Sequence, residues 1–152
     1  MKLIAYHSNG GNTKHVANII KGNIEADILE IEPVKKLPKN KAFKVISGVL
    51  QTLSKKKPDL KHYDVDVSKY DEIYLGFPIW ASNYSAPIRT FLEKENLQNK
   101  EINLFICHSG DMGDEVVTEI KTKYKVSKVI DFKNVLKEND EVESKIKNWL
   151  GE

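Results

Sequence analysis

The chain has 152 residues, a formal net charge of +2 and one cysteine, with 30% charged and 40% hydrophobic residues. This length predicts one domain, residues 1–152, whose core needs neither disulfide nor metal staples. The lone Cys107 cannot form an internal disulfide, no segment resembles a signal peptide, and no apolar run approaches the roughly 20 residues of a membrane-spanning helix. We therefore expect a cytoplasmic protein with no membrane partner.

The positive charge is concentrated in one stretch of the chain. Residues 33–61 contain nine lysines and a single acid, Asp59. A run of this kind is typical of a solvated face or of a contact with an anionic partner. Aromatic residues that would stack on bases are not interleaved with these lysines. The sequence therefore does not favour nucleic-acid binding.

Near the start of the chain, a predicted strand over 3–6 and a predicted helix that runs to about residue 21 are joined by a loop of glycines and small polar residues. A helix N-terminus directs backbone N–H groups and the positive end of its dipole at one spot, which suits a phosphate. Glycines let the backbone approach such a ligand closely. The loop consists of Ser8, Asn9, Gly10, Gly11, Asn12 and Thr13.

Other functions of this loop agree less well with its residues. No lysine follows the glycines, as a P-loop for triphosphates requires, and the spacing differs from the dinucleotide pattern GxGxxG. A plain Asn-Gly turn between strands is the remaining alternative. The apolar residues after Thr13 recur with helical spacing and do not alternate, which argues against that turn. The loop therefore predicts a site for a monophosphate group.

Strand-like and helix-like segments alternate through the rest of the chain. We expect an edge strand over 26–32 and a helix over 40–55. Further strands are predicted over 72–77, 102–107 and 128–132, with helices after Ser85, over 116–124 and over 139–150. Parallel strands joined by helices predict an α/β sheet covered on both faces. In the helix over 40–55, the stripe expected to face the core is Ile46, Val49, Leu50 and Leu53.

Three polar or aromatic loops, 8–13, 78–85 and 108–113, follow predicted strands at their carboxyl ends. Ligands of open parallel sheets bind at that edge. The second loop carries Trp80 and Tyr84, flat side chains able to stack on a planar ring, although a half-buried loop aromatic is the alternative role for Trp80. The third loop can bring backbone groups to the edge of such a ring. A ligand with a phosphate at one end and a polycyclic ring at the other fits this layout, and FMN fits best.

The segment Ser8-Asn9-Gly10-Gly11-Asn12-Thr13 resembles the phosphate loop of flavodoxins, and Leu75-Gly76-Phe77-Pro78-Ile79-Trp80 resembles their first flavin-stacking loop. The order of elements over nearly the whole chain is similar to short-chain members of the flavodoxin-like superfamily. The resemblance implies a three-layer sandwich, a five-stranded parallel sheet of order 2-1-3-4-5 with helices on both faces, and FMN as cofactor. The cofactor-binding residues that it implies are Ser8, Asn9, Gly10, Gly11, Asn12 and Thr13 for the phosphate, Pro78, Ile79, Trp80, Ala81, Ser82 and Asn83 for the ring, and Ser109, Gly110, Asp111 and Gly113 for its other edge.

Two features depart from the flavodoxin pattern. Gly10 stands where the family usually has Thr, so one phosphate-binding hydroxyl is missing and weaker FMN binding is expected. Electron-shuttling flavodoxins are strongly acidic, and this chain is not. Because an acidic surface steers such shuttles onto basic partners, we expect this protein to dock on a different partner or to react directly with small molecules.

The leading functional hypothesis is an FMN-dependent oxidoreductase, with a quinone-like acceptor and NAD(P)H as a donor. The alternatives are a one-electron shuttle without its own substrate and a non-catalytic binding module with the same fold. No catalytic residue is predicted, because alternation along a strand sends Cys107 and His108 to opposite faces, and Cys107 is expected to be structural. No metal site is predicted either, since the four histidines lack ligand spacing. The redox partner, protein or small molecule, is not identified by the sequence.

Overall fold

The computed structural model describes residues 1–110, 112–135 and 139–151. Its helices are α1 (Asn12–Asn23), α2 (Lys41–Leu53), α3 (Ala86–Lys94), α4 (Asp114–Lys123) and α5 (Asn139–Leu150), with a 3-10 helix, η1 (Val67–Lys69). Its strands are β1 (Lys2–Tyr6), β2 (Asp27–Glu30), β3 (Glu72–Trp80), β4 (Asn83–Tyr84), β5 (Glu101–His108) and β6 (Val126–Lys133).

The main sheet has the strand order β2-β1-β3-β5-β6, and each neighbouring pair runs parallel. This confirms the predicted order 2-1-3-4-5, with β5 and β6 as the fourth and fifth strands of that scheme. It also confirms β2 as an edge strand. From β1 the chain proceeds to β2 on one side, and from β3 it proceeds to β5 and β6 on the other side. Such sheets bind ligands in the crevice outside the carboxyl ends of the two strands at this switch point, β1 and β3.

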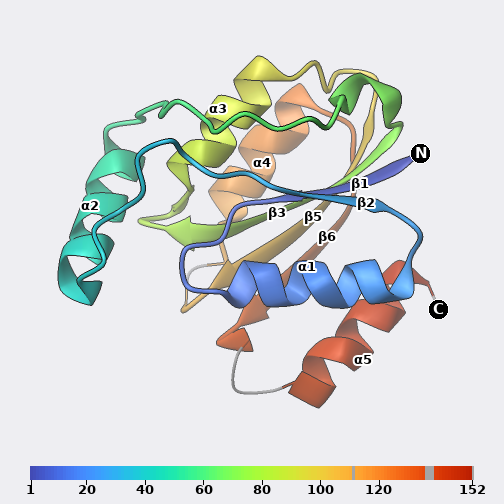
Figure 1. The fold of residues 1–152 in the computed structure, drawn as a ribbon. Coiled ribbons are helices and arrows are strands. Elements are labelled where there is room, and N and C mark those ends of the chain that lie inside the picture. Colours follow the sequence, from blue (N-terminus) through green and yellow to red (C-terminus); the bar gives the residue numbers. More distant parts are fainter. Residues whose placement is uncertain (111, 136–138, 152) are drawn as a thin grey trace.

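Helices cover both faces of the sheet, as predicted (Figure 1). Along β1, Leu3 and Ala5 belong to one buried cluster, whereas Ile4 and Tyr6 belong to the other. This alternation follows from the two-residue period of a strand. The first cluster includes buried residues of α3 and α4, and the second includes buried residues of α1 and α5. Figure 1 accordingly shows α1 and α5 below the sheet and α3 and α4 above it.

The segment 78–85 differs from the prediction, which treated it as a loop. Strand β3 continues to Trp80, and β4 returns antiparallel, so that Trp80 pairs with Asn83. Between them, Ala81 and Ser82 both have positive φ angles, 47° and 56°. Two consecutive left-handed residues form the type I′ turn that suits the twist of a hairpin. The sequence did not reveal this turn, because neither position holds the Gly or Asn that usually marks it.

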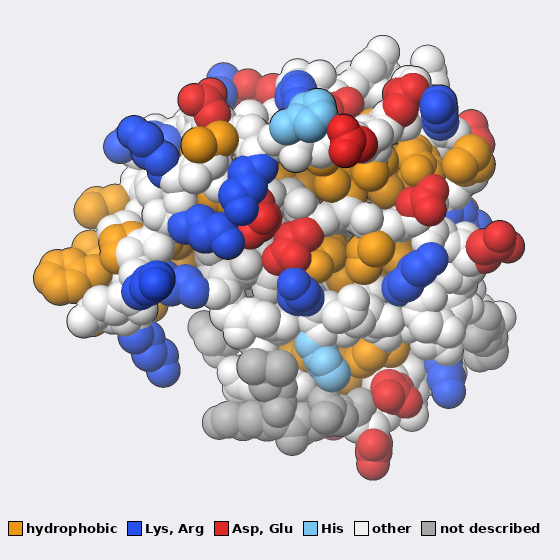
Figure 2. Space-filling model, viewed as in Figure 1, with side chains coloured by type: hydrophobic (Ala, Val, Ile, Leu, Met, Phe, Trp, Pro, Cys, Tyr) orange, Lys and Arg blue, Asp and Glu red, His pale blue; other side chains and the backbone are white. Residues whose placement is uncertain are grey.

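The inward apolar stripe predicted for α2 is wrong. Ile46 is 55% exposed and Leu50 is 60% exposed, as is much of Phe43. Val49 of the predicted stripe is half-buried, and the side chain of Leu53 lies outside the described residues. The buried positions of α2 are instead Gly48 and Thr52, on the opposite side. Figure 1 shows α2 projecting beyond the sheet, and Figure 2 shows hydrophobic side chains gathered on that projection, with Lys or Arg side chains beside them.

Among the described residues, no helix combines the length and the hydropathy that crossing a bilayer requires.

Candidate binding site at the carboxyl edge of the sheet

A cavity of about 180 Å³ lies where β1, β3 and β5 end. All three predicted loops contribute to it. Of the predicted residues, those that line it are Ser8, Asn9, Gly10, Asn12, Thr13, Pro78, Ile79, Trp80 and Ser109. The structure therefore brings together three segments that are far apart in the sequence, at the edge where open parallel sheets bind ligands.

The loop 8–13 forms a tight turn that leads into the start of α1. Gly11 caps the helix with a φ of 92°, a left-handed conformation that strongly favours glycine. Its N–H donates to Ser8 Oγ at 3.1 Å, and the first helical bond runs from His15 N–H to the carbonyl of Gly11 at 2.9 Å. The backbone N–H groups before His15 have no carbonyl partner inside the helix, as at any helix start. They point outward from the N-terminus, which is the positive end of the helix dipole.

Asn12 lines the cavity beside the start of α1 with a polar atom that lacks a hydrogen-bond partner. Its Oδ1 atom is buried and has no hydrogen-bond partner among the described groups. A buried polar atom without a partner is costly, and a side-chain amide can present either its oxygen or its NH₂ group to a ligand. Gly10 is less constrained, because a Cβ placed there would meet nothing within 4 Å. The residues present therefore fit a small polar group such as a phosphate.

Trp80 and Tyr84, paired in the prediction as ring-stacking residues, have different positions. Trp80 is half-buried and lines the cavity. Tyr84 is buried in the core instead, edge-on to Phe77 with ring centroids 6.0 Å apart. Its hydroxyl donates to Glu119 on α4 at 3.3 Å. Only Trp80 of this pair is therefore placed to contact a ligand, and the expectation for Tyr84 is wrong.

Among the residues that the structure describes, the other predicted members of the second and third loops do not line the cavity. Ala81 and Ser82 form the hairpin turn, and Asn83 Oδ1 accepts a hydrogen bond from Arg89 at 3.3 Å. Gly11 and Gly110 are also absent from the lining. Asp111 lies outside the described residues. Gly113 caps α4 with a φ of 72°, and a Cβ there would lie 2.5 Å from Cδ1 of Ile79, so its contribution is to allow this close packing.

Three lining residues were not predicted as site residues: Cys107, His108 and Asn134. Burial raises the pKa of the Cys107 thiol to about 12, against a smaller opposing effect of its hydrogen bond with Thr13. The thiol therefore stays protonated and unreactive at neutral pH. Asn134 directly follows β6, so the rule that carboxyl strand ends meet at one edge was the available signal for it.

His108 is held in place by Asp131, which projects from β6. The Nε2 atom of His108 lies 2.9 Å from Asp131 Oδ2, and this hydrogen bond lowers the pKa of the Asp131 carboxyl. The Nδ1 atom of His108 is buried and has no partner among the described groups. His108 is thus an oriented side chain at the cavity that is able to hold or accept a proton.

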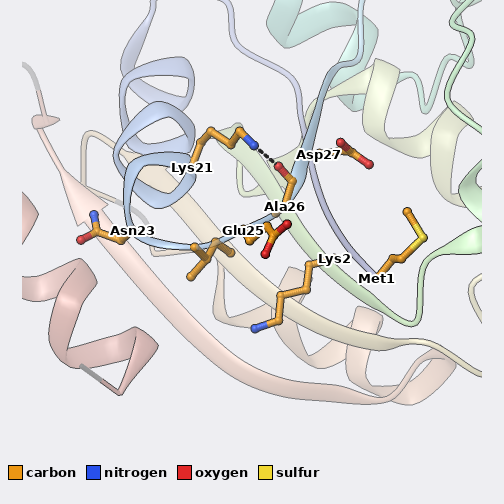
Figure 3. Close-up of a pocket in the computed structure, with 8 residues that line it drawn as sticks. Met1, Lys2, Lys21, Asn23, Glu25, Ala26 and Asp27 are labelled. Atoms are coloured by element: carbon orange, nitrogen blue, oxygen red, sulfur yellow. Dashed lines mark hydrogen bonds between the residues drawn. The ribbon is translucent and has the colours of Figure 1, made fainter.

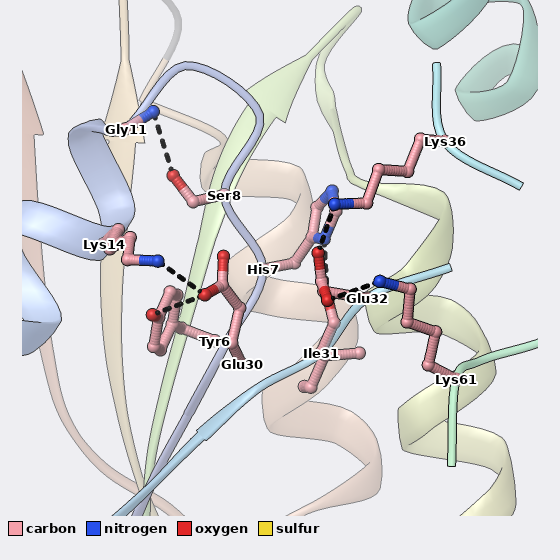
Figure 4. A network of polar contacts seen from close by, with 10 residues as sticks. All are labelled: Tyr6, His7, Ser8, Gly11, Lys14, Glu30, Ile31, Glu32, Lys36 and Lys61. Carbon is pink, nitrogen blue, oxygen red and sulfur yellow. Dashed lines mark hydrogen bonds and ion pairs between the residues drawn. The ribbon is translucent and has the colours of Figure 1, made fainter. Parts of the chain in front are cut away.

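A polar network supports the loop on the side that faces β2 (Figure 4). Glu30 accepts hydrogen bonds from Lys14 at 2.8 Å and from the Tyr6 hydroxyl at 3.2 Å. Nδ1 of His7 lies 2.7 Å from the carbonyl oxygen of Ile31, and burial lowers the pKa of this histidine. The network ties the end of β1 to the end of β2, which fixes where the loop begins.

Glu32 extends this network to two lysines of the basic stretch. Lys36 and Lys61 each lie 2.8 Å from its carboxylate, and their hydrogen bonds lower the pKa of Glu32 to about 2. Both lysines therefore have carboxylate partners, so part of the basic stretch is neutralised locally.

A larger hollow, about 800 Å³, lies at the opposite edge of the sheet (Figure 3). It is bordered by the amino ends of β1 and β2 and by the end of α1, where Lys21 donates to the carbonyl of Ala26. No predicted loop reaches it. Because parallel sheets bind ligands at the other edge, we place the functional site in the smaller cavity. Among the described residues, no group of three or more His, Cys, Asp or Glu side chains is arranged to hold a metal ion.

The fold and the site define a doubly wound α/β protein with a glycine-containing loop and a helix N-terminus at its topological switch point. The family model for flavodoxin matches residues 1–152, and the chain belongs to this family. No curated protein matches the chain.

Solved structures share this fold. A putative flavoprotein from Bacteroides eggerthii is 23% identical and has a TM-score of 0.79, with 99% of this chain and 95% of that chain covered. A putative flavoprotein from Bacteroides uniformis is 25% identical, with a TM-score of 0.78 and coverage of 96% and 97%. A flavoprotein from Lactobacillus acidophilus, solved in complex with FMN, is 22% identical, with a TM-score of 0.75 and coverage of 98% and 97%.

Proposed function

We propose that this protein binds FMN at the carboxyl-edge cavity and acts as an FMN-dependent redox protein. The observation that carries the proposal is the arrangement of the loop 8–13, whose helix N-terminus and buried Asn12 Oδ1 atom share one cavity with Trp80. Membership of the flavodoxin family supports it, as does the FMN complex of the similarly folded flavoprotein from Lactobacillus acidophilus.

The residues divide into two groups by the part of FMN that they would hold. Backbone N–H groups at the start of α1, with Ser8 and Asn12, would bind the phosphate. Pro78, Ile79 and Trp80 would contact the ring system from β3, and Ser109 would contact it from β5. These positions follow the order of the loops around the cavity. Apolar and aromatic walls with a few placed polar groups are what cofactor sites generally present.

When bound, FMN supplies the electron-transfer chemistry, and the protein controls access and the polarity around the ring. Among the described residues that line the cavity, the ionisable side chains are Cys107 and His108. The Cys107 thiol stays protonated because burial raises its pKa to about 12. His108, oriented by Asp131 at 2.9 Å, is the side chain placed to hold a proton there.

The donor and the acceptor are the finer part of the proposal. We propose an oxidoreductase that takes electrons from NAD(P)H and passes them to a quinone-like molecule, in the cytoplasm. The basic stretch supports a partner or substrate of negative charge, because exposed lysines steer anions to the surface. The competing function is an electron shuttle that exchanges electrons only with another protein.

Titration of the purified protein with FMN tests the cofactor. We expect the visible spectrum and the fluorescence of FMN to change on binding and saturate at one equivalent. Trp80→Ala should weaken the binding of FMN and of riboflavin alike, because Trp80 is assigned to the ring. Trp149→Phe, a change in α5 remote from the cavity, is the control. The absence of any spectral change at excess FMN would refute the proposal.

Steady-state assays then separate the two redox functions. Sustained NAD(P)H consumption in the presence of a quinone, by the FMN-loaded protein, would support the oxidoreductase. Reduction by dithionite without any NAD(P)H consumption would refute it and support the shuttle.

A further inference from the structure

Helix α2 touches both loops that the proposed function assigns to FMN. The ammonium group of Lys44 donates a hydrogen bond to the backbone carbonyl of Asn9, in the phosphate loop. One turn further along, Gly48 lies against Trp80, and a Cβ there would be only 1.5 Å from Cζ3 of the indole ring. Thr52, another turn along, is 1% exposed. Positions 44, 48 and 52 share one side of the helix, which we call the inner face of α2.

The inner face fits closely over the site. The space between it, Asn9 and Trp80 is only about 20 Å³. Any side chain at position 48 would overlap the volume that the indole ring occupies. The position of Trp80, and with it one wall of the cavity, therefore depends on the absence of a side chain on α2.

Lys44 also brings a positive charge to a loop that has none of its own. The six residues 8–13 include no Lys or Arg. The next lysine in the sequence, Lys14, is paired with Glu30 at 2.8 Å. Among the described residues, Lys44 forms no ion pair, and its ammonium group donates to a backbone carbonyl. An ammonium group has three donors, so Lys44 can hold the loop and still attract an anion beside it.

We propose that the inner face of α2 is part of the FMN site: Lys44 anchors the phosphate loop and places a positive charge beside it, and Gly48 seats Trp80. The proposal rests on the proposed function. Lys44 would also compensate for the phosphate-binding hydroxyl that is missing at Gly10, because its positive charge lies beside the phosphate loop. Lys44 and Gly48 are positioning residues, and the flavin chemistry itself does not involve them.

The test of Lys44 compares two ligands that differ only in the phosphate. We expect Lys44→Gln to weaken FMN binding about tenfold, as for the loss of a charge-assisted interaction, and to leave riboflavin binding unchanged. Lys44→Arg should restore most of the FMN affinity, since a guanidinium can also donate to the Asn9 carbonyl. Lys41→Gln removes an equal charge from the exposed start of the same helix and should leave both affinities unchanged.

Two results would overturn the role of Lys44. Equal weakening of FMN and riboflavin binding would mean that the lysine only stabilises the fold. Equal weakening of FMN binding by Lys41→Gln and Lys44→Gln would mean that only the overall charge matters.

Gly48 is tested through the indole ring itself. In a Trp149→Phe background, Trp80 is the sole tryptophan, since the chain has two. We expect Gly48→Ala to shift the emission of Trp80 even without FMN, and to weaken FMN and riboflavin binding together by about tenfold, as for displacement of a stacked ring. Gly22→Ala, in α1, is the control, because a Cβ there meets nothing within 4 Å.

Unchanged Trp80 emission in Gly48→Ala, together with unchanged FMN affinity, would overturn the assignment of Gly48. These outcomes differ from a failure of the proposed function, in which the unsubstituted protein itself would not bind FMN. A wild-type protein that binds FMN, with variants that bind it equally well, would refute only the role of α2.

Discussion

Helices α1 and α2 both lie beside the candidate site, but they are attached to the protein in opposite ways. Val16, Ala17 and Ile20 of α1 are fully buried against the sheet. Ile46 and Leu50 of α2 are more than half exposed, and the helix is held by its small and polar side. The difference shows that an apolar stripe reveals that a helix is amphipathic without revealing which side the protein buries.

Core substitutions should give the largest difference between the two helices. We expect Ile20→Ala to lower the free energy of unfolding by about 3 kcal/mol, because it removes a fully buried side chain. Leu50→Ala should change it by less than about 0.5 kcal/mol, since Leu50 is 60% exposed. Urea denaturation measures both. A loss for Leu50→Ala as large as that for Ile20→Ala would show that the apolar side of α2 is buried in solution.

The two helical glycines sharpen the comparison further. Gly48→Ala should lower the free energy of unfolding by about 1–3 kcal/mol, because the new methyl group overlaps the Trp80 ring. Gly22→Ala should raise it by about 0.5–1 kcal/mol, since alanine favours a helix and nothing lies within 4 Å. Thermal unfolding of the two variants beside the parent protein tests these signs, and a stabilising Gly48→Ala would place Trp80 away from α2.

The start of α1 offers a gain of function by a single substitution. Gly10→Thr adds a hydroxyl beside the phosphate loop, and the site has room for a Cβ. We expect FMN binding to tighten about fivefold, the value of one added hydrogen bond, with no loss of stability. Gly11→Thr is the matched comparison, and it should weaken binding because Gly11 has a φ of 92°. Titration with FMN distinguishes the two, and equal effects would contradict the geometry of the loop.

A pH change should produce the smallest difference between the two helices, and we expect it to act through His7. This histidine is buried beside Asn9 and lines the same small space as Gly48 and Thr52. Burial lowers the pKa of His7, so the unfolded chain binds its proton more readily than the folded protein does. The contribution of neutral His7 to the free energy of unfolding is therefore fully present above the ordinary histidine pKa of about 6.5. It declines as the pH falls below that value.

We accordingly expect acidification from pH 7.5 to 5.5 to increase amide hydrogen exchange in α2 more than in α1. His7→Gln should reduce this difference, whereas the exposed control His62→Gln should not. An unchanged pH response in His7→Gln would assign the effect to other groups.

Much of the architecture could be predicted from the sequence, because it depends on local patterns. The short apolar runs of β1, β3 and β5 and the helical spacing after Thr13 are properties of neighbouring residues, and the strand order followed from the family resemblance. The loop 8–13 was recognisable for the same reason, since glycines before a helix have a specific backbone role. Residues at the ends of strands were harder to assign: Asn134 was missed and Tyr84 was misplaced.

The turn at Ala81 and Ser82, the burial of Tyr84 and the orientation of α2 could not be predicted in this way. Each depends on contacts with residues distant in the sequence, such as Phe77 and Glu119 for Tyr84. Local propensity is a weak guide wherever packing against such neighbours contributes more free energy.

The sequence by itself determined the alternation of strands and helices, the class of the sheet and the glycine-containing loop before α1, because the periodicity of apolar residues and the conformational freedom of glycine act locally. The tertiary structure alone decided that Lys44 reaches Asn9 and that Gly48 meets Trp80. Those pairs are separated by more than 30 residues, and only the packing of the folded chain brings them within contact distance.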